Sequence, residues 1–377
     1  MKLTIGILFC DKDVQYTKDL VEIIKERVHI PYELVFFDNR RADNTVDISY
    51  LNEYTVLNTG KGNAMQVEGR RAIIKAAKGD YVWFIDADDE PLDIDEGALD
   101  LLEKSYDIYM FNFKKDQINE IFDYHDIHCD DCDGHSIHLC REDWLLEAEE
   151  GKNLCVRDSY THATKALWNK WIKTSILRDA ITLIPEGQKI SASEDFMLFL
   201  AALKFSKTEY FNTRYIYLFN TQRGNSVLTD YTGKFDRYLR CLAGVTTASH
   251  IIREFMTEEE LKAMNLDDLE CQDGFFFLTK VGYTKDAETR AEMLEVLERV
   301  IGREVIEQTW LHYLLSGMFF TKEEYYTLEG MLKERGYKTK LYDVITTRIV
   351  RDGKETIIEK KREVEADHHF RDSDSTK

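Results

Sequence analysis

The sequence lacks a long hydrophobic run and has few positive charges for its size. No stretch approaches the roughly 20 apolar residues that a membrane-spanning helix needs, so we expect no membrane span. Lys and Arg number 50 against 70 Asp and Glu, which gives a formal net charge of −20. General nucleic-acid binding relies on cations that neutralise phosphates. The acidity therefore argues against such a protein, although a local basic groove is compatible with it.

Proline and cysteine are also scarce. The chain has 3 prolines and 7 cysteines, and an odd number of cysteines in a long chain indicates reduced thiols in a cytoplasmic protein. No small-residue cleavage site follows the apolar run at 3–10, so we expect no secretory signal. With 377 residues, 44% hydrophobic and 32% charged, the composition is that of a folded protein with one large domain or two ordinary ones.

The first 90 residues alternate strand and helix patterns. Uninterrupted apolar runs predict buried strands, and apolar residues at helical spacing predict helices between them. This order implies right-handed crossovers and a mainly parallel sheet. The predicted elements are strands at 3–10, 32–38 and 81–87 and helices at 14–28 and 63–79, the second closed by Gly79.

Residues 81–91, YVWFIDADDEP, run from a buried strand directly into four carboxylates. Like charges held this close are unfavourable unless something neutralises them, and a divalent cation is the natural candidate. Asp86 and Asp88 form a DXD motif, and in extended backbone their side chains point the same way, with Asp89 beside them. Open α/β sheets place ligands at this end of their strands. A solvated acidic loop is the alternative.

Further along, strand and helix patterns mix as far as Thr229, after which helical patterns dominate. The predicted elements are strands at 106–113 and 215–220, a hairpin over 124–140, a helix at 166–177, a helix at 191–205 with Ser193 as its N-cap, and helices at 235–255, 258–270, 287–301, 303–319 and 322–335. We therefore predict an α/β domain over 1–228, a helical domain over 229–344, a terminal β-hairpin over 345–365 and a disordered tail over 366–377.

Motifs of the α/β part resemble those of the family-two glycosyltransferases, which have the GT-A fold. DNRRADNT (38–45) is similar to the family's VDDGSTDNT, and NTGKGNAMQVEGRRAIIKAAKGDYVWFIDADD (58–89) is similar to its next two motifs. WNKWIKTSIL (168–177), LIPEGQKISASEDFMLF (183–199) and YLFNTQRGNSV (217–227) follow in the family order. The resemblance covers about residues 1–228 and implies a GT-A nucleotide-sugar-binding domain with a mixed, mainly parallel sheet. Residues 229–377 match no family pattern.

On the donor side, the resemblance implies a metal-dependent glycosyltransferase of the hexosyl- or pentosyltransferase class that uses a nucleotide-sugar, with a UDP-sugar expected. Asp88 and Asp86 would hold Mn²⁺ or Mg²⁺, with Asp86 also near the ribose, and Asp38 would contact the nucleotide base. Arg70 and Arg223 would contact the diphosphate, since guanidinium offers planar bidentate contacts to phosphate. The alternative for both arginines is an ordinary solvated charge.

On the acceptor side, Asp195 would be the general base, with Glu194 beside it. A free aspartate is ionised at neutral pH and can take the proton of an attacking hydroxyl. One displacement on an α-linked donor inverts the anomeric centre. The alternative for Ser193, Glu194 and Asp195 is an N-cap followed by acidic residues that the helix dipole favours.

Some residues depart from the family pattern. Arg40 and Arg41 replace a Gly-Ser pair, Arg71 stands where Asn is common, and Ile73 stands where Gly is usual. These departures affect the expected contacts to base and ribose more than the chemistry. Trp168 and Trp171 are either a stacking platform for the acceptor or core residues.

A segment rich in His and Cys, 124–140, has the Cys-x-x-Cys spacing of a zinc site at Cys129 and Cys132. A structural zinc site takes four N or S ligands, usually as two well-spaced pairs. The second pair is ambiguous here, and strand alternation would scatter the side chains to both faces. Ordinary hairpin residues are the competing interpretation.

The acceptor is left open by the sequence: a glycan or other polymer, a lipid-linked intermediate, a protein, or a hydroxylated nucleobase of DNA. The alternatives to a glycan-directed enzyme are a DNA-modifying glycosyltransferase and a non-catalytic sugar-binding or scaffold protein on the same fold. A sugar nucleotidyltransferase would need a Gly-rich phosphate loop after the first strand, and FCDKDVQ (9–15) offers none. The helical domain either packs within the chain or forms a homo-oligomer.

Overall fold

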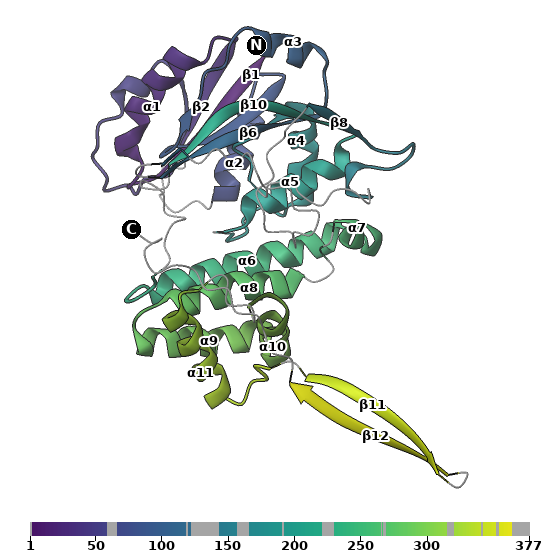
Figure 1. Cartoon of the computed structure of the whole chain (residues 1–377). Coiled ribbons are helices and arrows are strands. Elements are labelled where there is room, and N and C mark those ends of the chain that lie inside the picture. Colours follow the sequence, from purple (N-terminus) through teal and green to yellow (C-terminus); the bar gives the residue numbers. More distant parts are fainter. Residues whose placement is uncertain are drawn as a thin grey trace. The chain divides into compact units, whose positions relative to one another are not determined.

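The computed structural model describes residues 2–58, 66–117, 120–121, 143–156, 166–190, 192–220, 230–264, 266, 269–314, 320–340, 342–351 and 354–363. The chain divides into two compact units (Figure 1). The first comprises Met1–Val227 and Ala243–Asp267, and the second comprises Leu228–Leu242 and Asp268–Lys377. The boundary therefore passes through helix α6 (Phe235–Phe255), whose first part belongs to the second unit.

The first unit is built on a mixed, mainly parallel sheet, as the sequence predicted. Its strand order is β3-β2-β1-β4-β9-β6-β10-β5, with β7 and β8 paired at the side. β9 is antiparallel to both of its neighbours, while β6 and β10 are parallel to each other. The strands are β1 (Leu3–Phe9), β2 (Tyr32–Asp38), β3 (Thr55–Asn58), β4 (Tyr81–Asp86), β5 (Glu90–Pro91), β6 (Ile108–Gln117), β7 (Glu120–Ile121), β8 (Trp144–Glu147), β9 (Lys170–Lys173) and β10 (Thr208–Asn220).

Helices cover both faces of this sheet. Alternate residues of β1, such as Ile5 and Ile7, share a buried apolar cluster with Leu20 and Ile24 of α1. The opposite face at Gly6 lies against Ile73 of α2. Helices α4 and α5 also contact α2. The elements of this unit are α1 (Val14–Arg27), α2 (Gln66–Ala76), α3 (Gly97–Glu103), α4 (Thr174–Ala180), α5 (Glu194–Phe205), α7 (Glu258–Ala263) and short 3-10 turns η1 (Ser49–Leu51), η2 (Leu154–Val156) and η3 (Ile181–Leu183).

The register of the parallel strands brings two predicted site residues to one edge. Phe9 of β1 pairs with Asp38 of β2, and Leu8 pairs with Asp86 of β4. Asp38 and Asp86 therefore end strands on either side of β1, about 10 Å apart at the usual spacing of ~4.8 Å between neighbours.

Two glycines allow close approach of backbone segments in this unit. A Cβ on Gly79 would lie 2.5 Å from the backbone nitrogen of Thr4, and a Cβ on Gly69 would lie 2.6 Å from Leu8. Helix α2 ends at Ala76, so the prediction that Gly79 closes it as a C-cap was wrong. Gly79 instead lets the turn after α2 pass against β1.

The predicted helix at 166–177 was wrong in its first part. Residues Lys170–Lys173 form β9 between β4 and β6, and only Thr174–Ala180 are helical. Trp171 and Ile172 have high β-propensity, and both are buried in the sheet. Tertiary pairing therefore overrides the helical spacing of the apolar residues.

Residues 243–267 belong to the first unit through a buried ion pair. Lys204 of α5 lies 2.6 Å from Glu260 of α7, and Asn153 donates a hydrogen bond of 3.0 Å to the same carboxylate. Thr257 caps α7 and forms a reciprocal capping box with Glu260. Glu260 thus connects α7 to the helix that carries Asp195.

The second unit is mostly helical. Tyr238, Phe277, Leu278, Trp310 and Tyr325 are buried in its core. Of the helix predicted over 303–319, the structure describes α10 and a π-helical turn as far as Leu314. The helix predicted over 258–270 ends at Ala263, with a separate helix from Leu269. The remaining elements are α8 (Leu269–Tyr283), α9 (Ala287–Ile301), α10 (Arg303–Thr309), η4 (Trp310–Leu314), α11 (Lys322–Glu334), and an antiparallel pair β11 (Tyr342–Arg351) and β12 (Lys354–Glu363).

Within the described part of the chain, no helix has the length and apolarity needed to cross a bilayer.

Candidate active site

The chain turns sharply where β4 ends. Asp86 is the last residue of the strand, and the backbone N–H of Asp89 donates to the carbonyl of Asp86 at 3.1 Å. Asp88 therefore lies in a turn. The prediction that Asp86 and Asp88 point the same way because of strand alternation was wrong in its reasoning, since extended backbone ends at Asp86.

Asp89 anchors this turn to β10. Its carboxylate accepts hydrogen bonds from the Tyr217 hydroxyl and the Asn220 N–H, both at 2.6 Å. The Tyr217 oxygen in turn accepts the N–H of Asp86 at 3.3 Å. Burial raises the pKa of Asp89 to about 8, with repulsion from Asp86 adding to the effect. Asp89 is thus an internal support for the turn that carries Asp86 and Asp88.

A second acidic pair lies at the start of α5. Glu194 and Asp195 occupy its first turn, where the helix dipole favours negative charge. Ser193 occupies the N-cap position, but it has a left-handed backbone (φ 62°) and its side chain makes no capping bond. The predicted side-chain cap is therefore absent, so N-capping by Ser193 does not explain this motif.

Arg70 of α2 joins the two acidic groups. Its Nη2 lies 2.5 Å from Oδ1 of Asp195, 3.7 Å from Oε1 of Glu194 and 3.9 Å from Oδ1 of Asp86. The guanidinium also lies over the Phe84 ring, 4.9 Å from its centroid. Arg70 is only 4% exposed. The strand end and the helix start therefore meet at one buried cation.

The charges around Arg70 do not balance. Loss of water raises the pKa of Asp86 to about 7; Arg70 opposes this shift, while Asp195 and Asp88 reinforce it by repulsion. Burial raises the pKa of Glu194 to about 8, with repulsion from Asp195 adding to it. Additional positive charge would relieve this repulsion.

Arg70 also has hydrogen-bonding capacity to spare. Its Nε and Nη1 atoms are buried and have no hydrogen-bond partner among the residues that the structure describes. A buried donor without a partner is costly. An anionic group that entered the site beside Arg70 would satisfy these donors.

The residues around Asp86 fit one type of metal site. Among the described residues, no group of three or more His, Cys, Asp or Glu side chains is arranged to hold a metal ion. Mg²⁺ is commonly held by one or two carboxylates together with substrate phosphates. Asp86 and Asp88, whose carboxylates repel each other, fit this pattern, whereas an all-protein metal site does not.

Asp38, the expected base contact, is held by a residue that the sequence pattern did not assign to the site. Arg40 donates from Nε and Nη2 to the two carboxylate oxygens of Asp38, at 2.9 and 2.8 Å. Arg40 also donates from Nη1 to the carbonyl of Val46 at 2.6 Å. Arg41 pairs with Asp11 at 2.6 Å. In the sequence, the only sign of the Arg40–Asp38 pair was that Arg40 and Arg41 replace the family's Gly-Ser.

The two tryptophans differ in their surroundings. Trp171 is fully buried and packs against Trp83 and Phe111 in the core, which supports the core interpretation. Trp168 is only partly buried and stacks on Tyr217 with ring centroids 4.7 Å apart. It therefore lies next to the turn that Asp89 supports.

Two of the predicted site features fall outside the described residues, as does the predicted tail 366–377. Arg223 lies in the segment 221–229, and the His- and Cys-rich segment lies within 122–142. Both stay predictions from the sequence.

The sheet order, the carboxylates at the ends of its parallel strands and the acidic start of α5 define an α/β domain with an acidic site at the edge of its sheet. Residues 7–146 match the model of the family described as "Glycosyl transferase family 2". This match confirms the predicted resemblance over that segment. No curated protein matches the sequence.

The chain is also similar to solved structures of TarS from S. aureus. The chain is 14% identical to TarS 1-349 in complex with UDP, with a TM-score of 0.48, and the match covers 96% of this chain and 98% of that one. For TarS 1-349 in complex with UDP-GlcNAc, the identity is 15% and the TM-score 0.47, with coverage of 97% and 99%. For the longer TarS structure, the identity is 16% and the TM-score 0.46, and the match covers 95% of this chain and 60% of that one.

Proposed function

We propose that this protein is an inverting, metal-dependent glycosyltransferase that moves a hexosyl or pentosyl group from a nucleotide-sugar, with UDP as the nucleotide, to an acceptor hydroxyl. The observation that carries the proposal is the convergence of Asp86, Glu194 and Asp195 on Arg70. A transferase needs donor-binding acids and a general base in one site, and these residues supply both.

On the donor side, Asp88 and Asp86 would hold Mn²⁺ or Mg²⁺. Such an ion neutralises the charge that develops on the leaving diphosphate. Arg70 would donate its unpaired N–H groups to the same diphosphate. The Asp38–Arg40 pair at the end of β2 would face the nucleotide base, where its remaining donors and acceptors contribute to recognition.

On the acceptor side, Asp195 would take the proton as the hydroxyl attacks the anomeric carbon. A base of this kind typically contributes about 10²–10⁴-fold to the rate. The pKa of Glu194, raised to about 8 by burial, keeps this neighbour largely neutral at pH 7. The pair then carries one negative charge in place of two, and Arg70 orients the Asp195 carboxylate. An α-linked donor would give a β-linked product.

The test is a screen of nucleotide-sugar turnover with Mn²⁺ or Mg²⁺, with and without EDTA. We expect slow hydrolysis of a UDP-sugar that EDTA abolishes. Asp195→Asn should abolish transfer and leave nucleotide binding intact. Equal loss of binding and transfer in this variant would contradict the role of Asp195 as the base, and absence of turnover with every donor would contradict the proposal itself.

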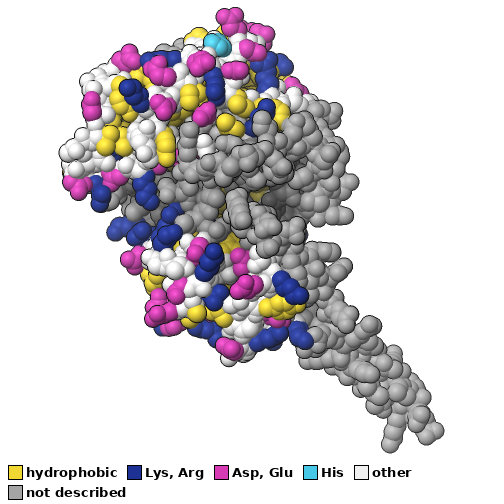
Figure 2. Space-filling view, turned by 60° about the vertical axis from the view of Figure 1, so that its left-hand side comes forward, with side chains coloured by type: hydrophobic (Ala, Val, Ile, Leu, Met, Phe, Trp, Pro, Cys, Tyr) yellow, Lys and Arg dark blue, Asp and Glu magenta, His cyan; other side chains and the backbone are white. Residues whose placement is uncertain are grey.

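No observation favours DNA as the acceptor. The arginines that suggested it have protein partners: Arg40 binds Asp38, Arg41 binds Asp11, and Arg70 binds Asp195. On the face shown in Figure 2, acidic side chains lie among most of the basic ones. The acceptor class, the cytoplasmic location and a homo-oligomer through the helical part stay predictions from the sequence.

A further inference from the structure

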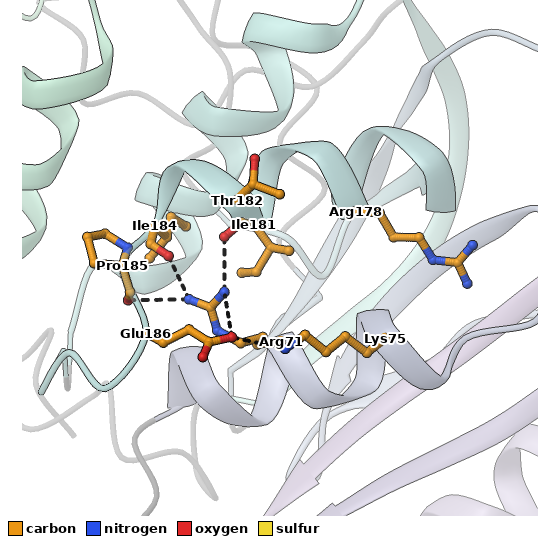
Figure 3. Close-up of a pocket in the computed structure, with 8 residues that line it drawn as sticks. All are labelled: Arg71, Lys75, Arg178, Ile181, Thr182, Ile184, Pro185 and Glu186. Atoms are coloured by element: carbon orange, nitrogen blue, oxygen red, sulfur yellow. Dashed lines mark hydrogen bonds and ion pairs between the residues drawn. The ribbon is translucent and has the colours of Figure 1, made fainter.

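Arg71, the residue after Arg70 on α2, faces away from the acidic cluster. Its guanidinium donates from Nη1 to the carbonyl of Ile181 at 3.0 Å. Nη2 donates to the carbonyls of Ile184, at 2.7 Å, and Pro185, at 3.3 Å (Figure 3). Arg71 is 5% exposed, so these are buried bonds from a charged donor, which are stronger than neutral ones.

Further contacts hold the same loop to α2. Glu68, one turn before Arg71, accepts the N–H of Gly187 at 3.1 Å and lies 3.3 Å from Nε of Arg71. Lys75, one turn after, pairs with Glu186 at 3.0 Å on the exposed side. The loop 181–187 is therefore bound mainly through its backbone, and Arg71 supplies most of the buried bonds.

This loop leads directly to the general base. Residues 181–193 connect α4 to α5, and Glu194 and Asp195 follow at their end. Arg71 fixes the start of the connection, and Arg70 contacts its end through Asp195. Two adjacent arginines of one helix thus fix both ends of the segment that leads to Asp195.

We propose that Arg71 is a positioning residue for Asp195, acting through the 181–187 loop. The inference rests on the proposed function and adds to it a residue that does not touch the reacting groups. A base must lie within hydrogen-bonding reach of the proton it takes, and a misplacement of about 1 Å can cost on the order of 10²-fold in rate. Loss of Arg71 releases three carbonyls and lets the loop move.

The cavity beside Arg71 has a volume of about 450 Å³ and is also lined by Lys75 and Arg178. It is not a ready anion site, because the Arg71 guanidinium is already bound by carbonyls and Lys75 is paired with Glu186. Arg178 is exposed and donates from Nη2 to the carbonyl of Ala77 at 2.7 Å. Arg178 is therefore a matched control from the same cavity.

The experiment compares Arg71→Met, Arg71→Lys and Arg178→Met with the unmodified chain. For Arg71→Met we expect kcat to fall about 30- to 100-fold, with the KM and dissociation constant for the donor within about threefold. Arg71→Lys keeps the charge but loses the planar fork, so we expect an intermediate loss. Arg178→Met should stay within about twofold of the unmodified chain. Active-site concentration is measured by donor-binding stoichiometry, which separates altered positioning from a smaller folded fraction.

Hydrogen exchange provides a readout that does not depend on activity. In Arg71→Met we expect faster exchange of amides in 181–195 and unchanged exchange in β1 and β4, whereas Arg178→Met should show neither change. An unchanged kcat, a fall in kcat matched by lost binding sites, or unchanged exchange in 181–195 would overturn the inference. If the unmodified chain turns over no donor, the proposed function fails, and hydrogen exchange alone then decides whether Arg71 holds the loop.

Discussion

Nη2 of Arg70 lies 2.5 Å from Oδ1 of Asp195, although the two residues are far apart in the chain and lie on different helices. The same nitrogen also lies within 4 Å of Glu194 and Asp86. A single buried cation therefore fixes the relative positions of the predicted metal-binding turn and the predicted base, and its removal should affect stability and chemistry together.

Replacing Arg70 with Met should lower the free energy of unfolding by up to about 3 kcal/mol, because it leaves the partly buried carboxylates of Asp195 and Glu194 without their cation. Urea unfolding measures this change. The double variant Arg70→Met/Asp195→Asn should recover part of the loss, since it removes the carboxylate that lies closest to the lost guanidinium. Lys75→Met is the control: Lys75 forms an exposed ion pair on the same helix, and its loss should cost less than about 1 kcal/mol. Equal costs for the two single variants would contradict the central role of Arg70.

Replacing Tyr217 with Phe should loosen the metal-binding turn. The variant removes the hydrogen bond to Asp89 and the acceptor for the Asp86 N–H, at an expected cost of about 1–3 kcal/mol. Mn²⁺ affinity, measured by calorimetry in the presence of nucleotide, should fall as well. Tyr238→Phe is a suitable control, because the Tyr238 hydroxyl is buried and has no partner among the described residues. That variant should be neutral or slightly stabilising, and a cost equal to that of Tyr217→Phe would argue against a specific anchor.

The stability of the protein should depend on pH through Glu194. Its folded-state pKa is raised to about 8 by burial, while a free Glu has a pKa near 4.3. The folded state therefore binds more protons between these values, so this contribution is complete below pH ~4 and is lost as the pH rises through about 8. Glu194→Gln should gain stability relative to the unmodified chain as the pH rises from 5 to 9, as measured by urea unfolding at each pH. A constant difference between the two proteins would show that Glu194 does not titrate in this range.

Mn²⁺ should stabilise the protein through Asp88. Saturation at about 100 times the dissociation constant adds roughly 2.7 kcal/mol, visible as a rise in Tm that EDTA reverses. Asp88→Asn should remove most of this rise. Asp80→Asn is the matched control, because Asp80 lies at the opposite end of β4 and is exposed. A full rise in Tm in the Asp88→Asn variant would show that Asp88 does not bind the metal.

Replacing Ser193 should not destabilise the protein, although its N-cap position alone would suggest that it does. A non-glycine residue in the left-handed conformation costs about 1–2 kcal/mol, and Ser193 makes no capping bond that would offset it. Ser193→Gly should therefore be neutral or stabilise by up to ~1 kcal/mol, and Ser193→Ala should change little. Thermal unfolding measures both variants. A loss of ~1 kcal/mol in the free energy of unfolding of each, as expected for a true cap residue, would contradict this interpretation.

The first strands and helices were predicted well because the local sequence determines them. Strand β1, helix α1 and strand β4 carry clear apolar patterns, and the acidic residues after β4 mark the edge of the sheet. By contrast, β9 was predicted as a helix, because its apolar spacing is ambiguous and only pairing with β4 and β6 decides it.

Within the site, the residue types that bear charge were visible in the sequence, but their partners were not. The contact of Arg70 with a diphosphate stays a prediction, while its ion pairs with Asp195, Glu194 and Asp86 were not visible in the sequence. The Tyr217–Asp89 hydrogen bond joins residues 128 positions apart, and no local pattern encodes it. Arg71 was noted only as a departure from the family, since its partners are backbone carbonyls of a distant loop.

The ion pair between Glu260 and Lys204 determines how the first unit could be produced alone. A fragment that stops near residue 228, where the family-like motifs end, would lack α7 and leave Lys204 of α5 partly buried without its counter-charge. Since α5 begins with Glu194 and Asp195, the loss would affect the helix that carries the proposed base. A fragment that ends at Asp267 keeps this ion pair and all of the first unit, and it is the shorter piece worth expressing.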